Sequence, residues 1–367
     1  MRTLLLIVAS LHGLIHFMGL FKAYKWASLP ELSLSVSQRM GVLWGITGMA
    51  FLIGAILVLL KKEGWVYFLG MAVVVSQILI IAAWKDAKFG TLANIIVVVL
   101  GILVYGAEAF QNRFEQDVQK TASASNATIE LLHENDIAEL PNPVQNYLRL
   151  TGIIGKPKVQ SFYAEMQGTM RSEGEDWFHF TSQQYNALKP AARHFLMKAR
   201  VKGIQTTGYH SYFDHQASMD IRLLSLFSVE KISGEALFKA ETVTFLNDLC
   251  LFAPSNLLHP NLKWESINET TVKVIFNNQG VEVSAKLYFD EEGYLRNFVS
   301  NDRLDVNRHK TFRFSTPIHE FQEINGYRLP RTAEAIWHYP EGDFTYGTFE
   351  ITSVTYNPNL EDLKSSD

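Results

Sequence analysis

Two histidines in the first apolar stretch, "LHGLIHFMGL", are the residues whose type and spacing most directly suggest chemistry. His12 and His16 are four residues apart, so a helix places both imidazoles on one face. Two neutral imidazoles one turn apart can share a metal ion or relay a proton. A carboxylate at the same level would support this, but Glu108 falls at the opposite end of the predicted bundle. Hydrogen bonding to neighbouring helices is the structural alternative, so the pair is a weak metal candidate.

Four apolar segments must position these histidines. They run from about 4 to 21, 41 to 60, 66 to 84 and 91 to 109, and each approaches the roughly 20 residues that cross about 30 Å of hydrocarbon. The second segment has no charged residue and ends at Lys61 and Lys62, as a helix leaving the bilayer should. Residues 1–110 are therefore predicted to form four transmembrane helices, in preference to a cleaved signal peptide or a soluble bundle.

Polar residues on the other segments fall at similar depths when successive helices alternate in direction. They are Thr47, Ser76, Gln77 and Asn94. Because polar groups in lipid are costly, such residues normally face the interior of a bundle. We expect them to form an intramembrane polar layer with His12 and His16.

Charge is distributed unevenly along the chain. Residues 1–110 carry 8 Lys and Arg against 4 Asp and Glu, whereas the remainder carries 25 against 33. An acidic second part without a stripe of Lys and Arg argues against nucleic-acid binding. Basic residues flanking the four segments are divided equally between the two sides, so they do not predict the membrane orientation. Cys250 is the only cysteine, which excludes an intramolecular disulfide and a thiolate zinc site.

The chain changes character after the fourth segment. Residues 111–140 are charged and rich in Ser and Ala, and they predict a juxtamembrane helix and a linker. Residues 141–367 contain about ten runs with the period of a strand, such as "VEVSAKLYFD", separated by turn signals such as "NNQG" and "DEEG". The fold class is therefore α + β: a four-helix transmembrane bundle followed by a large antiparallel β half-barrel or curved sheet covered by helices.

One helix interrupts the strands. Residues 234–252 have a helical pattern that ends before Pro254, and four apolar residues lie along one face: Phe238, Phe245, Leu249 and Phe252. We expect this helix to cover the concave side of the sheet, with these four side chains as a candidate apolar lid. The sequence favours a filled core beneath it and leaves an elongated ligand cavity as the alternative.

Other candidate chemistry in the second part is weak. His210 and His215, with Asp214, come nearest to a metal group, but their spacing matches no known metal motif. Asn247 and Asp248 are expected to hydrogen-bond backbone near the end of the covering helix. A nucleophilic set of Cys250, His259 and Asp248 is not supported, because Cys250 lies in an apolar run. No catalytic residue and no cofactor is predicted, and enzymatic activity is not expected.

Three stretches resemble an uncharacterised bacterial family of membrane proteins, a domain of unknown function. They are "WKDAKFGTLAN", "LPNPVQNYLRLTG" and "FLNDLCLFAPSNLLHPNLKWESIN". The resemblance covers almost the whole chain, and it implies four membrane helices followed by a β domain similar to the periplasmic lipoprotein-carrier half-barrel. It implies acyl-chain binding and an extracytoplasmic position for the β domain, but it transfers no ligand residue.

The leading hypothesis is a multi-pass protein of the bacterial cytoplasmic (inner) membrane whose tethered β domain binds a lipid or other long apolar ligand. Its predicted partners are the bilayer and that ligand. A ligand-free scaffold or sensor domain is one alternative. An intramembrane metal or redox site that uses His12 and His16 is the other.

Overall fold

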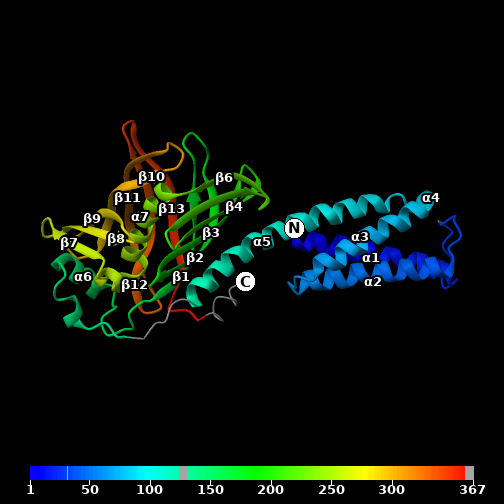
Figure 1. The fold of residues 1–367 in the computed structure, drawn as a ribbon, viewed down its shortest axis with the longest axis horizontal. Coiled ribbons are helices and arrows are strands. Elements are labelled where there is room, and N and C mark those ends of the chain that lie inside the picture. The colour runs from blue at the N-terminus through cyan, green and yellow to red at the C-terminus, as the bar shows by residue number, and fades with distance from the viewer. Residues whose placement is uncertain (31, 124–129, 360–367) are drawn as a thin grey trace. The chain divides into compact units, whose positions relative to one another are not determined.

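A computed structural model describes residues 1–30, 32–123 and 130–359 of the chain. The chain forms two compact units, Met1–Phe110 and Gln111–Asp367. The first consists of long apolar helices, and the second is built on an antiparallel half-barrel sheet (Figure 1). The predicted fold class is confirmed.

Three whole helices and part of a fourth form most of the first unit. They are α1 (Arg2–Ala23), α2 (Gln38–Leu59), α3 (Trp65–Ala82) and the first part of α5 (Gly90–Ser123), with the short α4 (Trp84–Ala87) before α5. α1, α2, α3 and α5 are long and apolar enough to cross a membrane. Their outer faces are apolar too, since Leu11, Ile46 and Ile78 are 57%, 60% and 62% exposed. Such a surface suits contact with lipid rather than with water.

Glycines bring α1 and α2 close together. A Cβ atom placed on Gly48 would lie 2.6 Å from the backbone oxygen of Gly13, and one on Gly41 would lie 2.3 Å from the Cβ atom of Ala23. Small residues at a helix interface let backbones approach closely, which is a common basis of helix association in membranes. The packing of this pair therefore depends on the absence of side chains at these positions.

α5 is one continuous helix of 34 residues. The predicted transmembrane helix at 91–109 and the predicted juxtamembrane helix after it are thus a single element, because the residues after Gly106 change in polarity but include no proline. Its last turns belong to the second unit, where Thr121 Oγ1 lies 2.8 Å from His194 Nε2 and Tyr209 donates to Asp117 at 2.7 Å. Residues 124–129 of the predicted linker lie outside the described residues.

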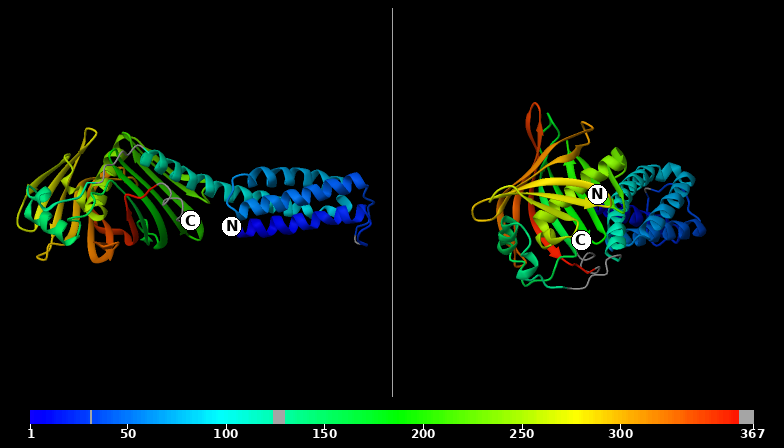
Figure 2. Two further views of the ribbon diagram at one scale, coloured as in Figure 1. Left: turned by 90° about the horizontal axis from the view of Figure 1, so that it is seen from below. Right: turned by 60° about the vertical axis from the view of Figure 1, so that its left-hand side comes forward.

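The second unit is built on a 13-stranded sheet in which every neighbouring pair is antiparallel. From β1 the chain moves outward strand by strand to β6 at one edge, crosses through α7 (Glu235–Phe252) to β7 at the other edge, and returns to β13 beside β1 (Figure 2). The strands are β1 Ser161–Met170, β2 Phe178–Leu188, β3 Ala191–Val201, β4 Ile204–Phe213, β5 Gln216–Leu223, β6 Phe227–Ser233, β7 Leu262–Ser266, β8 Thr271–Asn278, β9 Val281–Phe289, β10 Leu295–Asp305, β11 Lys310–Ile324, β12 Tyr327–Tyr339 and β13 Gly342–Tyr356.

The runs with the period of a strand correspond to β1–β3, β5 and β8–β13, and three strands lie outside them: β4, β6 and β7. β4 contains the polar run "QTTG", which weakens the apolar alternation on which the prediction depends. β6 and β7 are short and lie at the two edges of the sheet, where one side of the backbone has no neighbouring strand. Pairing with the adjacent strands makes them part of the sheet.

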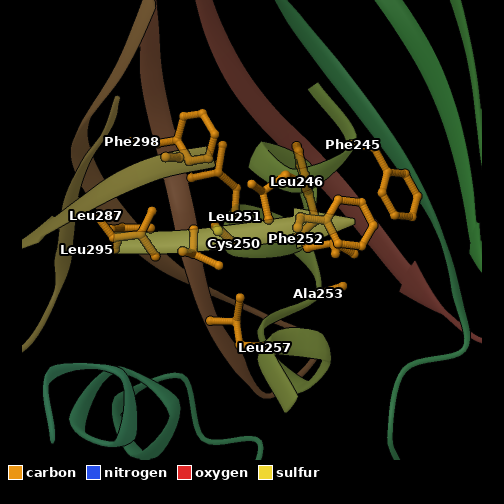
Figure 3. Close-up of a cluster of buried hydrophobic side chains, with 14 of the residues drawn as sticks. Phe245, Leu246, Cys250, Leu251, Phe252, Ala253, Leu257, Leu287, Leu295 and Phe298 are labelled. Carbon is orange, nitrogen blue, oxygen red and sulfur yellow. The ribbon is translucent and has the colours of Figure 1, made fainter. Parts of the chain in front are cut away.

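Helices close one side of the sheet. α7 contacts β5, β6, β9, β10 and β12. The short helices η1 (Glu134–Ile137) and α6 (Asn142–Leu150) precede β1, and η2 (Pro254–Leu258) lies between α7 and β7. Tyr147 of α6 is fully buried and donates a hydrogen bond to the backbone oxygen of Cys250 at 2.8 Å. Leu246, Cys250 and Leu287 are part of the apolar core between α7 and the strands (Figure 3). This core fixes α7 across the curved sheet.

Candidate ligand-binding cavity

The curved sheet and α7 enclose a cavity of about 680 Å³ within the second unit. This volume falls in the range of roughly 300–1,000 Å³ that ligand pockets usually have. Residues of β1–β6, α7 and β10–β13 form its walls. Exposed residues, among them Glu173, Val229 and Asn307, also line it, so the cavity opens to the surface.

The walls combine flexible and aromatic apolar side chains. All four methionines of residues 111–367 line the cavity: Met166, Met170, Met197 and Met219. Methionine is unbranched and polarizable, so it adapts to guests of irregular shape. Aromatic side chains of β11–β13 form another part of the wall: Phe314, Trp337, Tyr339, Phe344 and Tyr346. The lining therefore suits a long apolar guest better than a small polar one.

The predicted lid faces mostly away from this cavity. Of its four residues only Phe252 lines the cavity. The rings of Phe238 and Phe245 lie 4.8 and 5.8 Å from that of Tyr212, and Leu249 lines a smaller cavity of about 320 Å³. The other residues of α7 that line the large cavity are Leu237, Ala240, Glu241, Thr244, Asn247, Asp248 and Leu251.

α7 thus has apolar contacts on more than one side. The most apolar face, which the sequence picks out, packs into the core, while the cavity face mixes apolar and charged residues. The expectation of a filled core is therefore correct for one face of α7 and wrong for the other.

A buried charged network stands at the cavity wall. Arg193 Nε donates to Asp248 Oδ2 at 2.8 Å, and its Nη1 donates to Glu241 Oε2 at 3.2 Å. Gln184 and Asn186 also donate to Asp248 Oδ2, at 2.8 and 3.1 Å. Buried charges are tolerated when they are paired and hydrogen-bonded in this way. The network ties α7 to β2 and β3.

The two carboxyl groups of this network differ in their pKa. Burial by itself raises the pKa of Glu241, but a hydrogen bond from His210 at 3.0 Å and the charge of Arg193 outweigh it and lower that pKa to about 2. Burial raises the pKa of Asp248, although Arg193 and Asn186 favour its ionised form. The expectation that Asp248 bonds to backbone is replaced by these side-chain contacts, and Asn247 donates to Thr316 Oγ1 at 2.9 Å.

The predicted polar layer in the first unit forms a hydrogen-bonded group. His12 Nε2 lies 2.9 Å from Asn94 Oδ1, and His16 Nε2 lies 2.9 Å from Ser76 Oγ. Asn94 in turn donates to Gln77 at 3.1 Å. These contacts join α1, α3 and α5. Thr47 is buried but donates to the backbone oxygen of Leu43 in its own helix, at 2.8 Å, and so stands outside this group.

The hydrogen bonds define the roles of the two histidines. His16 Nδ1 lies 2.8 Å from the backbone oxygen of His12 and must donate to it, which leaves its Nε2 to accept from Ser76. Both nitrogens of His16 are therefore occupied. Within residues 1–30, 32–123 and 130–359, no three His, Cys, Asp or Glu side chains are placed to hold a metal ion. The arrangement is that of interhelical hydrogen bonding.

The other candidates from the sequence are separated. His210 bonds to Glu241, whereas the backbone N–H of His215 donates to Gln279 at 2.9 Å. Cys250 is fully buried, and burial raises the pKa of its thiol well above the usual range, which opposes formation of a nucleophilic thiolate. Neither arrangement provides a reactive centre.

One group of side chains that resembles a catalytic triad was not predicted from the sequence. Ser315 Oγ lies 2.8 Å from His338 Nε2, and His338 Nδ1 lies 2.6 Å from Asp343 Oδ1, in the order of a hydrolase triad. Ser315 sits inside β11 between Phe314 and Thr316, which line the cavity, so its side chain is on the opposite face. The backbone of β11 pairs with β10 and β12 at this point, which leaves no N–H group there for an oxyanion hole. These contacts are cross-strand hydrogen bonds.

Comparison with known proteins identifies the family. Residues 130–349 match the family model described as "Family of unknown function (DUF6544)", and the chain belongs to this family. No curated protein sequence matches the chain. Among solved structures, it is similar to an outer membrane lipoprotein-sorting protein domain from Vibrio parahaemolyticus, with a TM-score of 0.34 and 10% identity over 56% of this chain and 88% of that one. It is also similar to a LolA superfamily protein from Nitrosomonas europaea, with a TM-score of 0.34 and 7% identity over 61% of this chain and 96% of that one.

Proposed function

We propose that this member of the DUF6544 family is a multi-pass protein of the bacterial cytoplasmic membrane whose β domain, residues 111–367, binds a lipid or other long apolar ligand. The four apolar helices are its membrane anchor. The observation that carries the proposal is the cavity of about 680 Å³ on the inner face of the sheet, lined by all four methionines of the β domain. Apolar, adaptable walls with an opening to the surface are what an acyl chain requires.

A variant that fills the cavity tests this function. Gly208 of β4 is paired with Met197 and Ile221, which both line the cavity, and a Cβ atom at Gly208 would lie 3.7 and 3.8 Å from these two side chains. The first carbon of a new side chain therefore fits, and a ring extends into the cavity. Thr181→Phe is the matched control, because Thr181 is exposed on the other face of β2.

The measurement is the lipid that co-purifies with the full chain, quantified by mass spectrometry of organic extracts after exchange into one defined detergent. We expect the wild type and Thr181→Phe to retain a stoichiometric species that Gly208→Phe loses. Equal retention by all three proteins would contradict binding in the cavity. No specific species in the wild type would favour the ligand-free scaffold.

We also propose that the β domain lies outside the cytoplasm. An even number of spans puts residues 60–64 and the β domain on one side of the membrane and residues 24–37 on the other. Because Cys250 is buried, single new cysteines report accessibility cleanly. We expect a membrane-impermeant maleimide to label Glu291→Cys in intact cells, and Ser35→Cys only after lysis. The reverse pattern would place the β domain in the cytoplasm.

A further inference from the structure

An unpaired arginine lies among the aromatic side chains of the cavity. Arg303 lines the cavity, and its guanidinium carbon lies 3.9 Å from the ring centre of Phe314, 5.4 Å from that of Trp337 and 6.0 Å from that of Tyr346. Stacking of this kind orients a guanidinium but uses none of its N–H donors. Arg303 is thus held in place with its hydrogen-bonding edge uncommitted.

The backbone directs Arg303 inward. The pairing of β10 with β11 shifts between Ser300 and Arg303, so that Ser300 faces Phe314 while Arg303 faces Phe312. This is an extra residue on β10, a β-bulge, and bulges re-aim side chains and recur beside functional sites. The bulge brings Arg303 to the face of the sheet that carries the aromatic group.

The other arginines of the cavity have acceptors. Arg193 bonds to Asp248 and Glu241, and Arg171 Nε donates to the backbone oxygen of Thr345 at 3.1 Å. Arg308 stacks on Tyr339 at 3.7 Å and also pairs with Glu173 at 2.8 Å and with Glu341 at 3.1 Å. Among the residues that the structure describes, Arg303 is the cavity arginine with no hydrogen-bond acceptor and no ion pair.

We propose that Arg303 binds the anionic head group, a carboxylate or a phosphate, of an amphiphile whose chain occupies the cavity. This inference rests on the proposed function and adds the class of ligand. A guanidinium offers planar pairs of donors that match both anions, and such charge-assisted bonds are strong where water is scarce. The methionines Met166, Met170, Met197 and Met219 provide the complementary apolar surface for the chain.

A purely structural role for Arg303 is the competing explanation. Glu241 is in direct contact with Arg193 and His210, and the charge of Arg303 also favours the ionised form of Glu241 from a distance. That role requires a positive charge but no particular ligand. The two explanations differ in whether loss of Arg303 changes the selectivity of the cavity for head groups.

The test compares two photoreactive probes that differ only in the head group. The full chain in phosphatidylcholine nanodiscs is irradiated with a diazirine-bearing palmitate or with the corresponding palmityl alcohol, and adducts on peptides of β1, β3 and β5 are quantified by mass spectrometry. Four proteins are compared: wild type, Arg303→Gln, Arg303→Lys and, as matched control, Arg313→Gln, whose side chain is exposed on the face of β11 that points away from the cavity. Thermal unfolding of each variant shows that the β domain is folded.

We expect palmitate to label the wild type and Arg313→Gln in preference to the alcohol. Arg303→Gln should lower palmitate labelling about tenfold or more and leave alcohol labelling within about twofold, because one charge-assisted contact is lost. Arg303→Lys should fall between them, since it keeps the charge and loses the planar pair of donors. Competition by unlabelled oleate against a lysophosphatidate then distinguishes a carboxylate from a phosphate head group.

Two results would overturn the inference in different ways. Equal labelling by both probes, unchanged in Arg303→Gln, would refute the head-group site while the apolar cavity still stands as a ligand site. Absence of adducts in the cavity with either probe would refute the proposed function itself, and the head-group site with it.

Discussion

Replacing Arg193 by Met should strongly destabilise the β domain. It removes the partner of two buried carboxylates, Glu241 and Asp248, whose oxygens lie 3.2 and 2.8 Å from the guanidinium. Breaking a buried ion pair by removing one partner typically costs about 3–5 kcal/mol, because a charge is left without compensation. We expect the free energy of unfolding of the β domain to fall by that amount at pH 7.

The loss of stability in Arg193→Met should be smaller at low pH than at pH 7. In the wild type the pKa of Glu241 is lowered from 4.5 to about 2, so its stabilisation is present above about pH 4.5 and is lost as the pH falls toward 2. In Arg193→Met, Asp248 loses its ion pair and Glu241 keeps only His210, so the pKa of both carboxyl groups should rise and they should take up protons more readily. The difference between variant and wild type should therefore shrink as the pH is lowered from 7 to 5.

The assay is urea unfolding of the full chain in detergent micelles, followed by pulse proteolysis of the β domain at pH 7 and pH 5. Arg308→Met is the matched control. Arg308 also contacts two carboxylates, but these are 61% and 66% exposed, and exposed pairs contribute at most about 1 kcal/mol. An Arg193→Met variant that loses no more stability than this control, or a loss independent of pH, would refute the reasoning.

Three further predictions follow from single residues. Gly48→Leu should lower the stability of the helix bundle by about 1–3 kcal/mol, because its Cβ atom would meet the backbone of Gly13. Gly70→Leu has open space around it and should leave the thermal denaturation of the bundle unchanged. His16→Leu should lower the stability of the bundle by about 1 kcal/mol in the same assay, because the hydrogen bond to Ser76 is lost. If elemental analysis showed that this variant also binds less metal, a metal site would be supported instead. Glu241→Gln should remove part of the acid sensitivity between pH 4.5 and 2 in urea unfolding, and an unchanged pH profile would count against its low pKa.

The helices of the first unit were predictable because about 20 consecutive apolar residues have one inexpensive arrangement in a membrane. The continuity of α5 was not, since the change from apolar to charged residues near Phe110 marks a change of surroundings within one helix. The alternation in β9 revealed a strand, whereas the polar β4 and the edge strands became recognisable only through their neighbours.

The cavity shows more clearly what the sequence leaves open. The bounds of α7 follow from its helical period, but in a helix buried on two sides the most apolar face is not the one that lines the cavity. Arg193 is 48 residues from Glu241 and 55 from Asp248, so no local pattern links them. The sequence nevertheless held an indication of this network. Glu241 and Asp248 lie seven residues apart on one face of an apolar helix, and buried acidic side chains require a partner.

The central claim, that the β domain holds a long apolar ligand, is tested most directly on residues 111–367 purified without detergent. This segment includes the end of α5, because Asp117 and Thr121 bond to Tyr209 and His194 of the sheet. Mass spectrometry of an organic extract should reveal about one anionic amphiphile per chain. A stable, folded domain that yields no such species, and that takes up none from vesicles containing oleate, would contradict the account.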